Sequence, residues 1–222
     1  MFRSRRQTSC HNSLSVVFAL FAVATLTAAA EDRINVRITT SHGLIEIALN
    51  HQHAPQAVDY FLSFIDNGRY SEGVFYRSAS FDENPERQMI QGGILLDALN
   101  SDNPSLEQFA ITPLMEFETT EQSGLRHQRG SVSLARDLLN TGGAIPELCF
   151  YLRDTAMLDA GGKRSYDQRG FPVIGEVTAG LSVIESISAE PRSGATTIPF
   201  LRGEILTQPV AIISIERLPD PL

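Results

Sequence analysis

Residues 74–93, with the sequence VFYRSASFDENPERQMIQGG, contain two polar side chains that are suited to hydrogen bonding, Arg77 and Gln91. Arg77 follows three apolar residues, and Gln91 stands directly before two glycines. An arginine held on a strand offers rigid, permanently charged donors, and a glutamine offers both a donor and an acceptor. Neither is a nucleophile or a base, so the pair suits chemistry that needs only binding and hydrogen bonding. Taken alone, the stretch favours the plainer interpretation of a strand-edge arginine, a loop and a glycine turn.

Other catalytic patterns are weaker. His51 and His53 could present two imidazoles, but no acidic or cysteine partner has recognisable ligand spacing, which favours a solvated loop pair. The glycine pairs at 142–143 and 161–162 lack the strand, helix and lysine of a phosphate-binding loop. Cys149 has no histidine partner that the sequence reveals, so we expect a buried, inert thiol. We therefore expect neither a metal nor a cofactor.

The first thirty residues have the features of a secretory signal peptide. Three arginines within the first six residues precede an apolar run over 14–26 and three alanines at 28–30. We expect cleavage near Ala30, which would place the mature protein in the periplasm or outside the cell. The alternative is an uncleaved membrane anchor, because the apolar region is nearly long enough to span a bilayer.

Composition limits the class of the mature chain, residues 31–222. The full sequence of 222 residues has a hydrophobic content of 42%, which is ordinary for one globular domain. The signal region carries three arginines and no acid, so 15 basic and 26 acidic side chains remain, a net charge of −11. This balance argues against binding to a nucleic-acid backbone. Cys149 is the single remaining cysteine, which excludes an internal disulfide, and no later stretch suits a membrane span. We expect a monomer.

Hydrophobic periodicity predicts a mainly β domain. Apolar residues at helical spacing predict helices over 55–66 and near 181–187, and the polar stretches at 95–110, 118–129 and 159–170 are typical of loops. The first and last strands show the clearest alternation, which favours an antiparallel barrel that its terminal strands close. The expected strands cover 34–38, 45–49, 74–77, 89–91, 130–135, 148–152, 173–177 and 209–215.

A series of segments resembles the cyclophilins, the peptidyl-prolyl cis–trans isomerases, in the same order and context. They are VRITTSHGLIEIAL, AVDYFLSFIDNGRY, FYR, MIQGG, RGSVSLAR, LDAGGKRSYDQRGFPVIGEV and GLSVIESI. The likeness covers roughly residues 34–217 and is strongest to the exported bacterial branch. It implies a closed eight-stranded antiparallel β-barrel capped by two α-helices, with a peptide groove on its outer face and no need for a cofactor.

The resemblance also implies roles for individual residues. Arg77 matches the groove arginine of the family, and Gln91 matches the glutamine that holds the substrate backbone, so these two are the expected catalytic residues. Met89 matches a wall of the proline pocket. The residues expected to contact the substrate are Phe75, Met89, Cys149, Leu158 and Phe171.

Several positions depart from the family pattern. Gln88 replaces an aromatic residue, Cys149 stands where a pocket phenylalanine is usual, and Met157 replaces a tryptophan or related residue. Extra residues also separate Arg77 from Gln91. We expect an isomerase that acts on proline-containing polypeptides and assists the folding of exported proteins. The alternatives are a non-catalytic binder of proline-containing segments or of a partner protein, and an unrelated secreted barrel that binds a small ligand.

Overall fold

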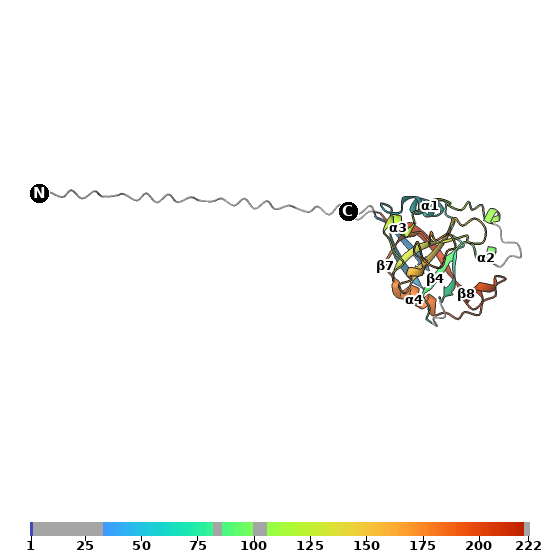
Figure 1. Ribbon diagram of the computed structural model, residues 1–222. Coiled ribbons are helices and arrows are strands. Elements are labelled where there is room, and N and C mark those ends of the chain that lie inside the picture. Colours follow the sequence, from blue (N-terminus) through green and yellow to red (C-terminus); the bar gives the residue numbers. More distant parts are fainter. Residues whose placement is uncertain (2–32, 82–85, 100–105, 220–222) are drawn as a thin grey trace.

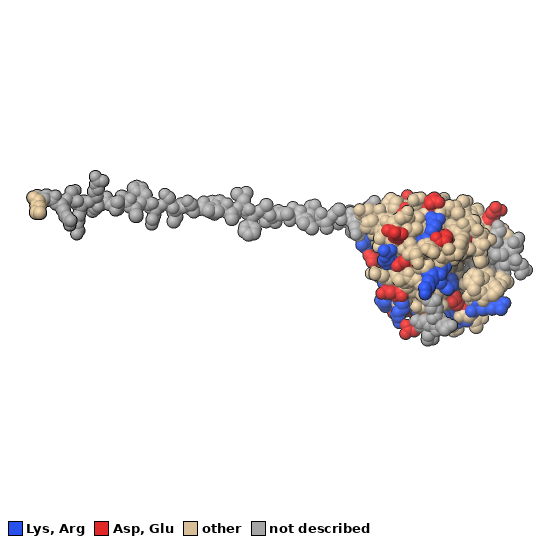
Figure 2. Space-filling model, viewed as in Figure 1, with Lys and Arg blue, Asp and Glu red and all other residues tan. Residues whose placement is uncertain are grey.

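A computed structural model describes residue 1 and residues 33–81, 86–99 and 106–219 (Figure 1). Nearly all of the expected signal peptide, including Cys10, lies outside these residues. On the face drawn in Figure 2, acidic and basic side chains are interspersed. Among the described residues, no helix has the length and apolar character needed to cross a membrane.

Eight antiparallel strands form a closed barrel in the order β1-β2-β7-β5-β6-β4-β3-β8. The terminal strands pair with each other, with Ile38 opposite Ile215, so the closed sheet has no free edge. This confirms the expected mainly β fold and its closure by the terminal strands. The strands are β1 (Arg33–Thr40), β2 (Gly43–Asn50), β3 (Val74–Ala79), β4 (Met89–Gly93), β5 (Ser131–Arg136), β6 (Ala144–Tyr151), β7 (Val173–Ala179) and β8 (Ile205–Arg217).

Two longer helices pack against the barrel, at the top and the bottom of the view in Figure 1. Helix α1 (Pro55–Asp66) contacts β2, β6 and β8, and α4 (Leu181–Ala189) contacts β2, β3 and β4. Both carry apolar residues on one face, as the periodicity predicts. The short segments are α2 (Leu96–Leu99), η1 (Leu106–Phe109), α3 (Thr120–Ser123), η2 (Ala156–Leu158) and η3 (Pro199–Leu201).

Strand β6 begins four residues earlier than expected and includes Pro146. A proline lacks the backbone N–H that a regular ladder needs, so it signals the end of a central strand. Here the register between β5 and β6 shifts between Leu134 and Arg136, and Pro146 lies within this irregular part of the pairing. The strand therefore passes through the proline without losing a regular ladder bond.

The expected loop at 118–129 contains the helical turn α3, which the hydrophobic pattern missed. Thr119 accepts a hydrogen bond from the backbone of Gln122, whose side chain accepts one from the backbone of Thr119. This reciprocal capping box stabilises a turn too short to show periodicity. The expected loop at 95–110 likewise includes α2 and η1.

The barrel interior is filled by large apolar side chains. Phe75 of β3 and Phe150 of β6 meet edge to face with ring centroids 5.6 Å apart, and both are completely or almost completely buried. An interior packed in this way has no room for a small ligand, which argues against the unrelated ligand-binding barrel. The other large buried apolar side chains include Ile38, Ile45, Ile47, Leu49, Phe61, Ile90, Leu134 and Leu148.

Replacing Phe150 with alanine should lower the free energy of unfolding by about 3–5 kcal/mol, because the change removes buried contacts and leaves a cavity. Urea unfolding followed by far-UV circular dichroism measures the effect. Phe200→Ala is the matched control, because the Phe200 side chain is 62% exposed. Equal losses in both variants would contradict the burial of Phe150 in the barrel interior.

Candidate active site

Arg77 extends from β3 between β4 and the segment that leads into β8. Its Nη1 donates to Gln91 Oε1 at 2.9 Å, and its Nε donates to Glu204 Oε2 at 2.8 Å. Arg77 Nη2 lies 2.7 Å from the same oxygen of Glu204, and the two side chains keep 15% and 16% of their exposure. The structure thus brings Arg77 and Gln91 together and adds a carboxylate partner, Glu204.

A β-bulge explains how neighbouring residues of β3 reach the same place. In the ladder between β3 and β4, Phe75 is opposite Gly92 and Arg77 is opposite Gln91, with a register shift between them. Such a bulge interrupts the alternation of side chains across the strand. Tyr76 and Arg77 consequently both bond to Gln91, whose Nε2 donates to the hydroxyl of Tyr76 at 2.8 Å.

A buried carboxylate ends this chain of hydrogen bonds. The Tyr76 hydroxyl donates to Glu147 Oε2 at 2.7 Å. The other oxygen, Oε1, accepts from the backbone N–H of Ile94 at 2.6 Å and of Leu95 at 2.9 Å. Glu147 has no exposure to solvent. The bonds therefore run without a break from Glu147 through Tyr76 and Gln91 to Arg77.

Gly93 is the residue that makes room for this carboxylate. A Cβ atom at Gly93 would lie 2.2 Å from Glu147 Oε1 and 2.6 Å from its carboxyl carbon, far inside contact distance. The second glycine of the MIQGG segment thus allows the Glu147 carboxylate to lie directly against β4.

Burial shifts the protonation equilibria of this network. It raises the pKa of Glu147 to about 7, although hydrogen bonds from Tyr76, Ile94 and Leu95 oppose the shift. Burial also raises the pKa of Tyr76 well above its usual value and that of the Cys149 thiol to about 12. Tyr76 and Cys149 are therefore neutral near pH 7, and Cys149 is the buried, unreactive thiol that the sequence predicted.

All five expected substrate contacts belong to one continuous apolar cluster, four of them near Gln91 or in the segments around Leu158 and Phe171. Met89 precedes Gln91 on the same face of β4, and Cys149 is opposite Gln91 in β6. Leu158 and Phe171 are joined by a backbone hydrogen bond of 3.0 Å from Phe171 to Leu158. Phe171 is partly buried, whereas Met89, Cys149 and Leu158 are almost completely buried.

Phe75, the fifth expected substrate contact, belongs to the same apolar cluster but faces the barrel interior. Its ring is completely buried and meets Phe150 inside the barrel. Cys149, the neighbour of Phe150 on β6, belongs to the opposite face of that strand. Phe75 thus supports β3 from the interior, and its role as a substrate contact stays a prediction that this placement does not favour.

The polar run between Arg77 and Gln91 supplies an aromatic side chain of its own. Phe81 is buried in the apolar cluster, and its backbone N–H donates to Gln88 Oε1 at 2.7 Å. The guanidinium of Arg164 lies over the Phe81 ring at 4.9 Å. Met157 also packs against this cluster, partly buried. Gln88 therefore holds an aromatic residue of this run in position.

Tyr151 is a second aromatic residue that the sequence did not single out. It is opposite Met89 in the ladder between β4 and β6, and its hydroxyl lies 2.9 Å from the hydroxyl of Ser133. Its ring meets His127 edge to face at 4.9 Å. Alternation along β6 places Tyr151 on the same face as Cys149, and this periodicity is the signal that could have identified it.

Arg136 at the end of β5 organises the loop that carries Phe171. Its Nε donates to the carbonyl of Gly142 and its Nη1 to the carbonyl of Gly170, both at 2.7 Å, and its guanidinium also pairs with Asp167. Gly170 has a φ of +69°, which favours glycine. Arg136 thereby fixes the backbone directly before Phe171.

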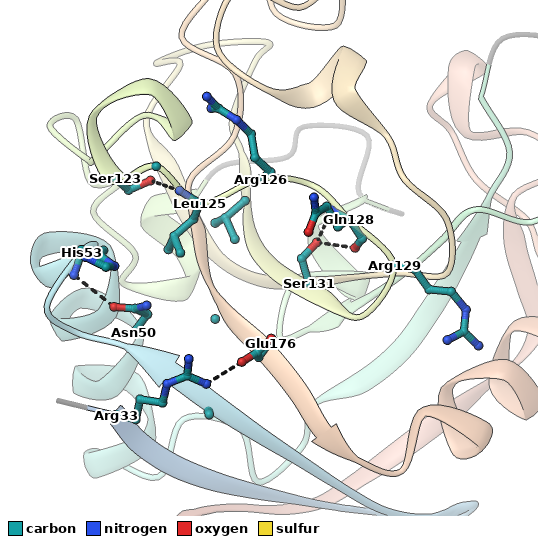
Figure 3. A pocket seen from close by; sticks show the side chains of 14 residues that line it. Arg33, Asn50, His53, Ser123, Leu125, Arg126, Gln128, Arg129, Ser131 and Glu176 are labelled. Carbon is teal, nitrogen blue, oxygen red and sulfur yellow. Dashed lines mark hydrogen bonds and ion pairs between the residues drawn. The ribbon is translucent and has the colours of Figure 1, made fainter. Parts of the chain in front are cut away.

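A separate cavity of about 580 Å3 lies between β2, β7 and the segment 123–129 (Figure 3). Arg33 and Glu176 form an ion pair at its lining, and the backbone of His53 donates to Asn50 Oδ1. Its lining residues include none from β3, β4 or β6. The cavity is therefore distinct from the site around Arg77. Within the described ranges, no group of three or more His, Cys, Asp or Glu residues is placed to hold a metal ion.

The buried carboxyl group of Glu147 should make stability depend on pH. Its pKa is about 7 when folded and 4.5 as a free group, so the unfolded chain ionises first and stability falls as pH rises between these values. We expect a loss of roughly 3 kcal/mol from this group, measured as the free energy of unfolding in urea.

Glu147→Gln should remove this decline. Buried His127, whose pKa burial lowers, contributes in the opposite direction, so the difference between variant and parent isolates Glu147. Glu46→Gln, on strand β2, is the matched control and should follow the parent. An unchanged decline in Glu147→Gln would show that Glu147 is not its source.

Comparison with known proteins agrees with the fold. The family model for cyclophilin-type peptidyl-prolyl cis–trans isomerases matches residues 35–217. The chain is 33% identical over 181 residues to peptidyl-prolyl cis-trans isomerase A of Dickeya dadantii, covering 79% of this chain and 85% of that protein. It is 29% identical over 185 residues to an isomerase of Streptomyces antibioticus, covering 82% and 98%.

A solved structure shows the same fold at low sequence identity. The cyclophilin-type isomerase of Cryptosporidium parvum aligns with a TM-score of 0.59 at 16% identity, covering 85% of this chain and 99% of that one. With a family model that matches most of its length and a relative that shares a third of the aligned residues, the chain belongs to the cyclophilin-type peptidyl-prolyl cis–trans isomerase family.

Proposed function

We propose that this isomerase binds proline-containing polypeptides at Arg77 and assists the folding of exported proteins. The observation that carries the mechanism is the guanidinium held between Gln91 and Glu204 beside an apolar cluster. Rotation about an X–Pro bond is slow because resonance stiffens it, with a barrier of roughly 18–20 kcal/mol. In the twisted transition state the imide nitrogen regains a lone pair. A donor aimed at that lone pair stabilises the transition state more than the ground state, which lowers the barrier.

Arg77 has donors to spare for this role. A guanidinium carries five N–H groups, and each terminal nitrogen has two of them. The contacts with Gln91 and Glu204 occupy Nε and one N–H on each terminal nitrogen. The remaining N–H groups belong to a guanidinium that is already oriented, so little reorganisation is needed when the transition state forms.

Gln91 retains capacity for the substrate backbone. Its Oε1 accepts from Arg77 and its Nε2 donates to Tyr76, which uses one lone pair and one N–H of the amide. A second lone pair and a second N–H are left for a peptide. The neutral Cys149 thiol and the Met89 thioether provide an apolar environment nearby, which favours the less polar, twisted imide.

A specific observation also supports the alternative of a binder without useful catalysis. Met89, Cys149 and Leu158 are almost completely buried, so they offer little apolar surface to a proline ring. Glu204 also pairs with Arg77, which reduces the net positive charge at the donor. Measurable binding of an Ala-Pro peptide without faster cis–trans exchange would favour this second function.

Arg77→Ala should slow peptide isomerisation about 100-fold, because one preorganised donor contributes roughly 3 kcal/mol to transition-state stabilisation. NMR exchange spectroscopy on a short Ala-Pro peptide measures the rate directly, and circular dichroism checks that the barrel is intact. Arg37→Ala, which removes an arginine of β1 paired with Glu46, is the matched control and should behave as the parent. Equal rates for Arg77→Ala and the parent would exclude Arg77 as the catalyst.

Export is the second element of the proposed role. The barrel begins with Arg33, so cleavage near Ala30 would leave every strand of the described residues intact. We expect the protein recovered from an exporting bacterial host to begin at or near Glu31, and mass spectrometry of its N-terminus measures this. Ala30→Leu should impair cleavage, because the site requires small residues. Recovery of the parent in the membrane with residues 1–30 retained would favour the anchor instead.

A further inference from the structure

We infer that Glu147 and Tyr76 are positioning residues that set which way the Gln91 side-chain amide faces, and so keep its carbonyl oxygen toward Arg77. This inference rests on the proposed function, in which Gln91 and Arg77 act on the substrate. An amide can turn by half a rotation and exchange its oxygen for its nitrogen with almost no change in shape. Packing alone therefore does not select between the two orientations.

The direction of the hydrogen bonds determines which of the two orientations the Gln91 amide adopts. Backbone N–H groups of Ile94 and Leu95 hold one oxygen of Glu147. An ionised carboxylate only accepts, so the hydroxyl of Tyr76 has to donate to the other oxygen. The Tyr76 oxygen is then free to accept from Gln91 Nε2, which turns Oε1 toward Arg77.

A proton on Glu147 would reverse this order. Protonated Oε2 would donate to the Tyr76 oxygen, and the Tyr76 hydroxyl would then donate to Gln91. The Gln91 amide would have to turn its oxygen toward Tyr76 and its nitrogen toward Arg77. The N–H groups of Gln91 and Arg77 would then face each other. Arg77 would lose its hydrogen bond to Gln91 and keep only its ion pair with Glu204. A single proton thus changes the support of the guanidinium without moving the backbone.

The neighbours of Glu147 stay neutral near pH 7, so the change in protonation can be attributed to Glu147 itself. Its titratable neighbours are Tyr76 on β3, Cys149 on β6 and Tyr70, whose hydroxyl donates to the carbonyl of Pro146; Arg77 lies beyond them. The tyrosines and the thiol stay neutral because burial raises their pKa values. Burial also brings the pKa of Glu147 to about 7, within the range where an assay can observe the change.

Two variants distinguish the effect of hydrogen-bond direction on the Gln91 amide from the effect of side-chain packing. Glu147→Gln keeps the shape of the side chain but places an N–H₂ group where a carboxylate oxygen accepted. Tyr76→Phe removes the hydroxyl and keeps the ring, which packs with Leu201 and Ile205 in a cluster of its own. The matched controls are Glu46→Gln on β2 and Tyr166→Phe, whose side chain is 74% exposed.

The direct test is the NMR titration of the Gln91 side-chain amide between pH 5.5 and 8.5. In the parent and both controls, we expect its two proton signals to shift together through one transition near pH 7. The transition should be absent in Glu147→Gln and in Tyr76→Phe. A Gln91 amide that does not titrate in the parent, or that titrates unchanged in either variant, would overturn the inference. If Glu147→Gln does not fold, Tyr76→Phe decides.

Isomerase kinetics provide the second readout. In the parent, kcat for an Ala-Pro peptide should fall about tenfold as pH drops below the transition, with little change in KM. The reason is that Arg77 loses its hydrogen bond to Gln91, and in the proposed mechanism Arg77 stabilises the transition state more than the bound substrate. Tyr76→Phe should show the lower kcat at every pH. A purely structural role would instead lower stability and leave the pH profile as in the parent. A parent without isomerase activity would refute the proposed function, whereas the amide titration would still decide the positioning inference.

Discussion

A carboxylate fully removed from water is the constraint on which the outer face of this barrel depends. Two backbone N–H groups and one tyrosine hydroxyl satisfy Glu147, and any unsatisfied charge at that depth would be strongly destabilising. The requirement explains Gly93, which leaves room for the carboxylate, and Tyr76, which supplies its third donor. Strands β3, β4 and β6 are thus joined by polar bonds on the outer face as well as by apolar contacts inside.

The same network supports the mechanism proposed for Arg77, in which no nucleophile or general base takes part. That mechanism requires a donor whose direction is set before the substrate arrives. Gln91 and Glu204, from separate parts of the chain, hold Arg77 on opposite sides, and both contacts are largely shielded from solvent. Glu204 has two opposing effects, because it orients the guanidinium and also offsets part of its charge.

The apolar part of the site combines a small thiol with aromatic rings. Cys149, Tyr151 and Phe81 all belong to one buried cluster, and Tyr151 is opposite Met89. Both rings are anchored, Tyr151 by Ser133 and Phe81 by the backbone bond to Gln88 and by Arg164 above it. Close packing of this kind tolerates exchanged residues when the total volume is preserved.

The sequence by itself determined the mainly β barrel, its closure by the terminal strands, and the pairing of Arg77 with Gln91, because alternation and family motifs are local signals. Only the tertiary structure decided that Glu204, 127 residues beyond Arg77, is a hydrogen-bond partner of its guanidinium, and that Phe75 faces the interior. The bulge after Phe75 interrupts the alternation of side chains along β3, so the facing of these residues could not be predicted from a period of two. Polar partners that are far apart in the sequence form no spacing pattern from which their contact could be predicted. The buried bonds of Glu147 belong to the same class, because they form only once β3, β4 and β6 are adjacent.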